Sequence, residues 1–380
     1  MKTQTNIKSY CFIARQYPPE TGFGGIGTYV WHMARALTSN GIDVTVFSYS
    51  IERDKTYVED GIKVVRTKAK SLISWYIKVT FFLIRNKFDV IEDAEFLGST
   101  FLYLMFFNRH SNFIHIKLHT CHKIIHYYEK RKSFFQKLKT YIINLLEAYV
   151  TRKANLVTAP TNFIKQVTGL LWNIPESRIK ILPHPFYISI NDEELKSIPG
   201  SYILYFGRLQ ELKHAELILY LCKRDFLKDK PLKLILIGED KWGFKNKLAM
   251  VDNDTSKKIE ILDHITDKKI LFAYIKFAKA VFLPSKFESF SFAMLESLWF
   301  NKKTFVLNNS GSLEIMISLG LDENILGERL LLFDSNYLIS KISKPIDLSI
   351  KEIRERITNI YGYNVIFNDF MKIMESGSLE

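Results

Sequence analysis

Short apolar and β-branched runs alternate along the chain with segments of helical periodicity. Apolar residues from Ile26 to Leu37 recur at helical spacing, so we expect the helix at 25–39 to bury one face. Such alternation of strands and helices is typical of a parallel α/β sheet. In the first half the runs predict strands at 8–14, 42–48, 89–92, 112–118, 155–160 and 179–183, and a second helix at 133–153.

A second series of the same kind begins after residue 200. The segment 184–201 is polar and contains prolines, as expected of a linker, and a last helix is expected at 363–375. The pattern therefore predicts two doubly wound domains, 1–188 and 189–362, with the last helix packing back across the first. The second series predicts strands at 202–207, 232–238, 258–263, 280–285 and 303–308, and helices at 214–223, 241–250, 267–277 and 291–301.

Length and composition agree with a globular protein of two domains. The chain has 380 residues, of which 47% are hydrophobic, and this exceeds the usual size of one hydrophobic core. Its three cysteines are far apart and no cleavable signal is recognised, so we expect no disulfides and a cytoplasmic location. No apolar run reaches the roughly 20 residues that span a bilayer.

The charge is strongly basic and unevenly distributed. Lys and Arg number 53 against 40 Asp and Glu, a net charge of +13. This composition admits a solvated surface, an anionic membrane, a phosphate-bearing acceptor or nucleic acid as explanations. The apolar segment 73–87 is explained most simply as buried helix faces, and alternatively as a membrane contact beside the basic stretch. Between residues 101 and 140 the basic residues are Arg109, Lys117, Lys123, Lys130, Arg131, Lys132, Lys137 and Lys139, against the single acid Glu129.

The first loop of interest lies between a predicted strand and a predicted helix, where open α/β sheets bind ligands. The segment 17–30 has glycines at 22, 24, 25 and 27, which let the backbone approach a ligand closely. Its G-x-G-x-x-G spacing also admits a dinucleotide site or a plain tight turn. A dinucleotide site is disfavoured, because no acidic residue ends the second strand.

Two further strand-to-helix loops carry charged residues. Arg208 and Lys213 flank the loop after the strand at 202–207, where two cations can clamp a diphosphate. Glu288 follows the strand at 280–285, and Glu296 lies in the next helix. Carboxylates at such positions accept hydrogen bonds from the paired hydroxyls of a sugar or ribose. Taken singly, each of these residues would be an ordinary surface or helix-terminal group.

Together these segments resemble the family 4 retaining glycosyltransferases of the GT-B fold, over nearly the whole chain. The glutamate pair matches the family's E-x7-E motif. The resemblance implies two facing Rossmann-like α/β domains with an interdomain cleft. The segments that carry it, in the family's order, are "PPETGFGGIGTYVWHMARALTSNGIDVTVFS", "HT" at 119–120, "ANLVTAPTNFIKQVTG", "ILPHPF", "YFGRLQELKH", "LILIGED", "DHITDKKILFAYIKFAKAVFLPSKFESFSFAMLESL" and "GSLEIM".

The resemblance also implies roles for individual residues. Arg208 and Lys213 would hold the diphosphate of a nucleotide sugar, and Glu296 its ribose. Glu288 and His119 would face the donor sugar as catalytic groups. Backbone groups of Gly24, Gly25, Ser291 and Phe292 would complete the phosphate cradle. Two residues depart from the family, which usually has glycine where Ser291 and His214 stand.

The activity implied is transfer of a sugar, with retention, from a UDP or GDP sugar to a glycan or lipid-linked acceptor in bacterial surface polysaccharide synthesis. No cofactor or metal is expected: "DND" at 252–254 reads as a surface turn, and "HTCH" at 119–122 lacks a second ligand pair. The enzyme would work in the cytoplasm, with anionic lipid contact at the inner face of the membrane. Alternatives are a GT-B sugar-nucleotide epimerase, a sugar-binding pseudoenzyme, or a basic nucleic-acid or membrane-binding protein; no recognition motif supports nucleic acid.

Overall fold

The computed structural model describes residues 7–21, 24–107, 112–128, 133–224, 227, 229–249, 253–308, 311–334 and 336–377. The chain forms two compact units. The N-terminal unit comprises Met1–Tyr127, Arg131–Tyr187 and Ile360–Glu380, and the C-terminal unit comprises Tyr128–Lys130 and Ile188–Asn359. Within the described residues, no helix is both long and apolar enough to cross a bilayer.

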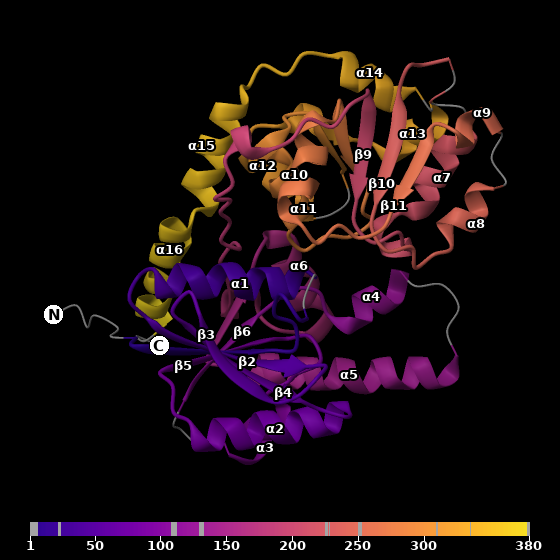
Figure 1. The fold of residues 1–380 in the computed structure, drawn as a ribbon. Coiled ribbons are helices and arrows are strands. Elements are labelled where there is room, and N and C mark those ends of the chain that lie inside the picture. Colours follow the sequence, from indigo (N-terminus) through magenta and orange to yellow (C-terminus); the bar gives the residue numbers. More distant parts are fainter. Residues whose placement is uncertain are drawn as a thin grey trace. The chain divides into compact units, whose positions relative to one another are not determined.

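The N-terminal unit is built on one sheet in the order β3-β4-β2-β1-β5-β6-β7-β8, in which only the β3–β4 pair is antiparallel. Its helix α1 (Gly25–Thr38) packs with α16 (Tyr363–Gly377), whereas α2 (Leu72–Arg85), α3 (Phe101–Phe106) and α5 (Phe134–Lys153) cover the other face (Figure 1). The strands are β1 (Ser9–Ala14), β2 (Asp43–Ser50), β3 (Lys55–Glu59), β4 (Ile62–Lys68), β5 (Val90–Ala94), β6 (Phe113–Lys117), β7 (Leu156–Ala159) and β8 (Ile179–Ile181). The remaining helices are α4 (His122–Tyr128) and α6 (Asn162–Trp172).

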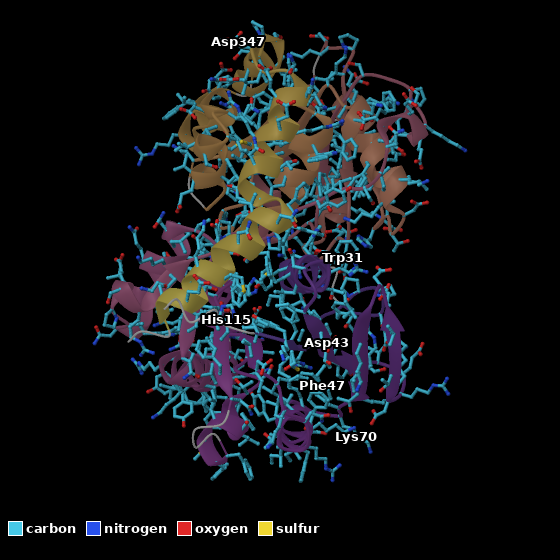
Figure 2. All side chains as sticks on the ribbon, turned by 90° about the vertical axis from the view of Figure 1, so that its left-hand side faces the viewer. Trp31, Asp43, Phe47, Lys70, His115 and Asp347 are labelled. Carbon is cyan, nitrogen blue, oxygen red and sulfur yellow. The ribbon has the colours of Figure 1, made fainter. Side chains whose placement is uncertain are left out.

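Aromatic packing joins the sheet to α2. The Phe47 ring of β2 stacks on Trp75 and Phe82 of α2, with ring centroids 5.5 and 4.2 Å away. Figure 2 shows Phe47 on this side of the sheet and Trp31 of α1 on the other. The inner side of α2 is therefore part of the core.

The C-terminal unit is built on a second sheet, entirely parallel, in the order β11-β10-β9-β12-β13-β14. The strands are β9 (Tyr202–Phe206), β10 (Lys233–Ile237), β11 (Ile259–Leu262), β12 (Ala280–Leu283), β13 (Thr304–Leu307) and β14 (Ile325–Leu326). The helices are α7 (Ala215–Lys223), α8 (Phe244–Leu248), α9 (Asn253–Ser256), α10 (Lys268–Phe277), α11 (Phe292–Phe300), α12 (Gly311–Ser318), α13 (Glu328–Phe333), α14 (Tyr337–Ser343) and α15 (Ile350–Tyr361).

Each strand predicted from the apolar runs is confirmed, but the structure adds elements and corrects one helix. β3, β4, β14 and several helices, among them α3 and α15, were not predicted. The helix expected at 241–250 is limited to α8, because the Asp240 carboxylate accepts hydrogen bonds from the Phe244 and Lys245 amides (2.8 and 3.0 Å) and Gly243 is left-handed. The helix therefore begins only at Phe244.

Both sheets have a point at which the strand order reverses. In the first, β1 lies between β2 and β5; in the second, β9 lies between β10 and β12. In open α/β sheets, ligands bind beyond the carboxyl ends of the strands at this switch point. The loops after β1, β5, β9 and β12 are therefore where each unit is expected to bind ligand.

Strand β5 places two carboxylates in the core on successive residues, Glu92 and Asp93, which point to opposite faces of the sheet. Asp93 accepts hydrogen bonds from the Thr100 amide and hydroxyl (2.8 and 3.0 Å). Burial nevertheless outweighs these bonds and raises the pKa of Asp93 to about 8. Burial likewise raises the pKa of Glu147 to about 8.

Asp93→Asn is expected to reduce the pH dependence of stability. An unfolded aspartate titrates near pH 3.9, so between about pH 4 and 8 the folded protein binds the extra proton and its unfolding free energy falls as pH rises. Asparagine keeps an acceptor for Thr100 and removes this titration. Urea unfolding of the wild type, Asp93→Asn and the exposed Asp43→Asn at pH 5 and pH 8 checks the prediction; equal pH dependence in all three proteins would contradict it.

Candidate functional site

The loops after β9 and β12 are joined to each other at the switch point of the C-terminal sheet. Lys213, at the end of a short 3₁₀ turn (Glu211–Lys213), forms an ion pair with Glu288 from the loop after β12. The Lys286 amide also donates to the Leu212 carbonyl at 3.0 Å. The predicted diphosphate and sugar ligands, Lys213 and Glu288, are therefore direct neighbours.

Arg208 also follows β9, but unlike Lys213 its side chain forms no ion pair with the described residues. The Tyr205 hydroxyl donates to the Arg208 carbonyl at 2.8 Å, which fixes the backbone directly after Gly207. The guanidinium is exposed and makes no hydrogen bond or ion pair within the described part of the chain. Its charge is available to an anionic ligand.

Helix α11 begins at the end of the β12 loop. Ser291 is its N-cap, and the serine hydroxyl accepts a hydrogen bond from the Met294 amide at 3.3 Å. The first amides of a helix have no acceptor within it and attract anions. Ser291, which stands where the related family usually has glycine, thus caps the helix whose first residue is Phe292.

Glu296 lies one turn into α11 and is held from a neighbouring helix. Lys268, the first residue of α10, contacts a Glu296 carboxylate oxygen at 2.6 Å, while the Glu296 side chain is only 12% exposed. Lys268 was not singled out from the sequence. A lysine at a helix start is an ordinary residue, and only the packing of α10 on α11 brings it to Glu296.

Gly311 fixes the backbone of Glu288. The first amide of α12, that of Gly311, donates to the Glu288 carbonyl at 2.8 Å. A Cβ on Gly311 would lie 2.6 Å from this oxygen, well inside contact distance. The close approach of α12 to the β12 loop therefore requires glycine at 311. This approach fixes the position of the Glu288 backbone, from which the side chain extends.

His214 adopts a conformation that usually requires glycine. Its φ is +60° and ψ is +40°, in the left-handed region, at the N-cap of α7. The imidazole lies 3.0 Å from the Glu328 carboxylate and 3.7 Å from that of Glu216. Burial opposes ionisation of Glu216, but bonds with His214 and Lys286 lower its pKa to about 2.

His119 follows β6, the neighbour of β5 in the N-terminal sheet, and buried polar residues surround it. The His119 amide donates to both oxygens of Glu95 at 2.8 and 2.9 Å. Its ring contacts those of Tyr29 and His184, with centroids 5.1 and 4.9 Å away. The ring atom Nε2 of His119 is buried and has no hydrogen-bond partner among the described residues.

The ionisation of His119 follows from its burial. Burial, helped by the neighbouring Lys117, lowers the pKa of His119 well below its usual range. Burial also lowers the pKa of Lys117 to about 7, and its amine donates to the Leu182 carbonyl. His119 is thus a neutral imidazole, and its buried Nε2 makes no hydrogen bond to the described residues.

Gly24 and Gly25 lie at the start of α1. Gly24 is the N-cap, and an added Cβ would lie 3.0 Å from the side chain of Gln16. Among the described residues, a Cβ on Gly25 would meet no atom within 4 Å. The described packing therefore does not require glycine at 25, whereas a ligand close to the backbone would. Gly22 lies outside the described residues.

Comparison with protein families gives two adjacent matches. Residues 23–188 match the family described as "Glycosyltransferase Family 4" and residues 190–327 match "Glycosyl transferases group 1". The chain belongs to the family 4, group 1 type glycosyltransferases. It is therefore an enzyme of the glycosyltransferase class. Comparison with curated protein sequences gives no match.

Solved structures show the fold of this glycosyltransferase. Sucrose-phosphate synthase from Thermosynechococcus elongatus has a TM-score of 0.71 at 13% identity, with 97% of this chain and 98% of that chain covered. The catalytic domain of starch synthase IV from Arabidopsis thaliana, bound to ADP and acarbose, has a TM-score of 0.71 at 11% identity. The match covers 98% of this chain and 100% of that chain. The lipopolysaccharide outer core galactosyltransferase WaaB has a TM-score of 0.63 at 16% identity, with 97% of this chain and 99% of that chain covered. The fold is GT-B, with two Rossmann-like units.

The glycosyltransferase's basic stretch at 101–140 is not one surface. Lys117 is fully buried, because its amine is used inside the N-terminal unit, so its assignment to a basic face was wrong. Lys123, Lys137 and Lys139 are exposed, and the other basic residues of the stretch, Arg109, Lys130, Arg131 and Lys132, lie outside the described residues. Among the side chains that the structure does describe, no group of three His, Cys, Asp or Glu is arranged to hold a metal ion.

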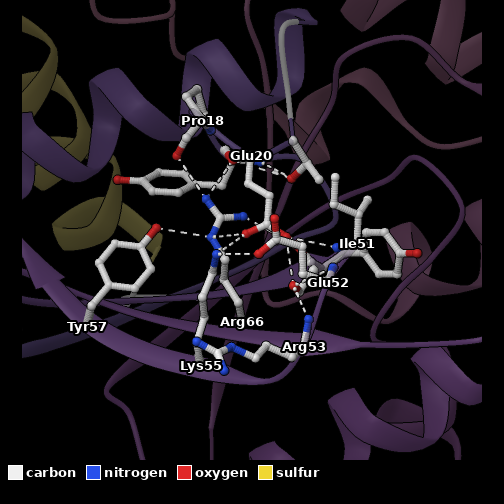
Figure 3. A network of polar contacts seen from close by, with 12 residues as sticks. Pro18, Glu20, Ile51, Glu52, Arg53, Lys55, Tyr57 and Arg66 are labelled. Carbon is white, nitrogen blue, oxygen red and sulfur yellow. Dashed lines mark hydrogen bonds and ion pairs between the residues drawn. The ribbon is translucent and has the colours of Figure 1, made fainter.

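A buried arginine holds the segment that leads into the glycine loop. Arg66 of β4 donates to the carbonyls of Tyr17 and Pro18, each at 2.9 Å, and to the Tyr57 hydroxyl at 3.0 Å (Figure 3). Its Nε also lies 3.4 Å from the Glu20 carboxylate, which Lys55 contacts at 2.7 Å. The turn at 17–21 is therefore anchored to the sheet by Arg66, together with the bonds that Glu20 accepts from the Ser50 hydroxyl and the Ile51 amide at 2.7 and 2.8 Å.

Arg66→Met is expected to destabilise the N-terminal unit by about 3 kcal/mol, because the Tyr17 and Pro18 carbonyls and the Tyr57 hydroxyl each lose a charge-assisted hydrogen bond and Glu20 loses one of its cations. The exposed neighbour Arg53 is the matched control, and Arg53→Met is expected to change stability by less than about 0.5 kcal/mol. Denaturant unfolding of both variants measures the difference. Equal stability of the two would show that Arg66 does not anchor the turn.

Proposed function

We propose that the chain transfers a sugar from a nucleoside diphosphate sugar, a UDP or GDP sugar, to a glycan or lipid-linked acceptor, with retention of configuration and without a metal. The observation that carries this proposal is the group of residues at the C-terminal switch point. Arg208, Lys213 and the start of α11 supply positive charge at one edge of one sheet. That is the arrangement a diphosphate needs.

The role of the cations follows from the charge that develops in the reaction. As the bond between the anomeric carbon and the diphosphate breaks, its electron pair remains on the leaving diphosphate. Arg208, Lys213 and the first amides of α11 stabilise that charge. Lys213 is paired with Glu288, so phosphate contacts compete with, or add to, this ion pair.

Glu296 is suited to bind the ribose. Its carboxylate is nearly buried, one oxygen contacts Lys268, and two neighbouring hydroxyls match a two-oxygen acceptor. Lys268 restrains the rotamer of Glu296 and so acts as a positioning residue. Glu288, with its backbone fixed by Gly311, is assigned to the hydroxyls of the transferred sugar.

His119 is assigned to the donor sugar on the evidence of its own bonding. Its neutral ring has an unused buried nitrogen, and Glu95 fixes the backbone from which the ring extends. A sugar hydroxyl can satisfy that nitrogen. The histidine then orients the donor rather than acting as an acid, because burial keeps its pKa low.

Retention is explained by departure and attack on one face of the sugar. The acceptor oxygen forms the new bond to the anomeric carbon on the side from which the diphosphate leaves. The acceptor's proton passes to an oxygen of the departing diphosphate. No enzyme nucleophile is then required, and the positive charge of the site holds the diphosphate in place while the bond forms.

We assign the acceptor to bacterial surface polysaccharide synthesis, carried out in the cytoplasm with peripheral contact to the inner face of the membrane. The likeness of fold to a lipopolysaccharide galactosyltransferase supports this pathway class. The basic, lysine-rich composition of the chain supports an anionic surface as partner. No nucleic-acid partner is proposed.

Thermal shift with UDP-, GDP-, ADP- and CMP-sugars, with and without Mg²⁺, tests the donor assignment. We expect one nucleotide sugar to stabilise the protein without metal. Arg208→Ala and Glu296→Ala should weaken its binding by about 10- to 100-fold, the value of a lost charge-assisted hydrogen bond. The exposed Lys257→Ala is the control and should bind as the wild type.

Absence of a shift with all four classes, or a shift unchanged by both variants, would contradict the donor site. A shift that requires Mg²⁺ would contradict metal independence. Conversion of the donor to a free epimer in the absence of acceptor would favour the epimerase instead.

Substitution of Gly25 separates folding from donor binding. A Cβ there meets no atom of the described residues, so Gly25→Ala and Gly25→Val should each change the unfolding free energy by less than about 1 kcal/mol. A phosphate near the backbone would be excluded increasingly by the larger side chain, so turnover should fall from glycine to alanine to valine. Full activity of Gly25→Val would show that no ligand approaches this position.

A further inference from the structure

Helix α2 exposes an apolar stripe to solvent. Its inner side packs on the sheet through Trp75 and Val79, as a globular helix normally does. Its outer side, however, carries Ile73, Ile77, Phe81 and Ile84 at helical spacing, and Ile73 is 68% exposed. The expectation that the apolar residues of 73–87 are all buried helix faces is therefore wrong for this stripe.

Helix α5 exposes a second stripe on the same side of the sheet. It is formed by Phe134, Phe135, Leu138, Tyr141, Ile142 and Leu145, with Phe134 and Phe135 at 75% and 79% exposure. Between the two helices runs an apolar groove of about 350 Å³, lined by Ile73 and Tyr76 from α2 and by Phe135 and Ile142 from α5. The stripes thus belong to one continuous surface, which we call the α2–α5 face.

The α2–α5 face is basic as well as apolar. Neither α2 nor residues 134–146 of α5 contains an aspartate or glutamate. Lys78 is paired with Asp54 at 3.3 Å, but Arg85, Lys137 and Lys139 are exposed on the two helices. Exposed aromatic and aliphatic groups beside unopposed cations are the pattern of helices that lie in the interface of a bilayer.

Charge distinguishes among the occupants of such a face. Two copies of the chain joined through it would bring like charges together, which opposes association. An anionic leaflet offers both an apolar interior for the rings and phosphates for the cations. No helix in the described residues is built to span a membrane, so contact would be peripheral.

We propose that the α2–α5 face binds the surface of an anionic lipid bilayer, with the exposed rings of α2 and α5 inserted among the acyl chains and Arg85, Lys137 and Lys139 at the head groups. The purpose of this contact rests on the proposed function, because a lipid-linked acceptor would be presented at that surface. The contact itself needs neither donor nor acceptor.

Vesicle sedimentation of the full chain tests the proposal. The probes are vesicles of phosphatidylcholine alone and of phosphatidylcholine mixed with phosphatidylglycerol. The double variant Phe81→Ser/Phe135→Ser should bind the mixed vesicles at least about tenfold more weakly, since each ring loses its apolar transfer energy. Lys137→Gln/Lys139→Gln, which leaves only Arg85 of the three cations, should reduce the preference for anionic vesicles. Phe333→Ser, which changes an exposed ring of the C-terminal unit, should bind as the wild type.

Absence of vesicle binding by the wild type, or equal binding by all variants, would overturn the proposal. A concentration-dependent dimer that the double phenylalanine variant dissociates, without vesicle binding, would also overturn it and assign the face to a second copy. The donor-induced thermal shift is measured on every variant. It verifies folding, and it separates failure of the membrane face from failure of the donor site.

Discussion

The geometry of the C-terminal site depends on the order of its parallel strands. Because the strand order reverses at β9, the chain leaves β9 and β12 toward opposite faces of the sheet, and the two loops diverge at the edge. The Lys213–Glu288 pair and the Lys286–Leu212 hydrogen bond join these loops across the divergence. A cation, a carboxylate and a helix start are consequently held together by backbone topology before any ligand is present.

Two glycines show how fold and function can be separated in this enzyme. Gly311 is required by packing, since a Cβ would collide with the Glu288 carbonyl. Gly25 is required by nothing around it in the described structure, although a flexible residue at a helix start lowers stability. This contrast is why the proposed function assigns Gly25, and not Gly311, to the phosphate of the donor.

The strands were predictable because buried parallel strands are nearly continuous apolar runs, and here each run is flanked by helical periodicity. The β3–β4 hairpin was missed because its strands alternate and are partly exposed. Its signal is the Asp60–Gly61 pair, in which both residues have positive φ and which is typical of a two-residue hairpin turn. The exposure of part of α2 could not be predicted either, because Ile73, Ile77, Phe81 and Ile84 are apolar and nothing in their type distinguishes them from the buried residues of the same helix.

The same reasoning explains which parts of the site could be found. Arg208, Lys213, Glu288 and Ser291 follow strands directly in sequence, so the topology alone brings them to one edge of the sheet. Lys268 and Gly311 act through the packing of α10 on α11 and of α12 on the β12 loop, contacts that no local pattern records. The buried nitrogen of His119 likewise depends on residues from separate strands and helices.

His214, which stands where the family usually has glycine, changes the electrostatics of the site without removing any of its charged residues. A side chain at positive φ costs roughly 1 kcal/mol, which contacts with Glu328 and Glu216 offset. Glu216 in turn pairs with Lys286, so His214 is linked through one carboxylate to the loop that carries Glu288. Lys286 and Lys213 are thus each matched by a carboxylate, and Lys268 is matched by Glu296. Arg208 alone among these four cations has no carboxylate partner in the described residues, so it is the cation that the proposed diphosphate would engage without competing with a carboxylate.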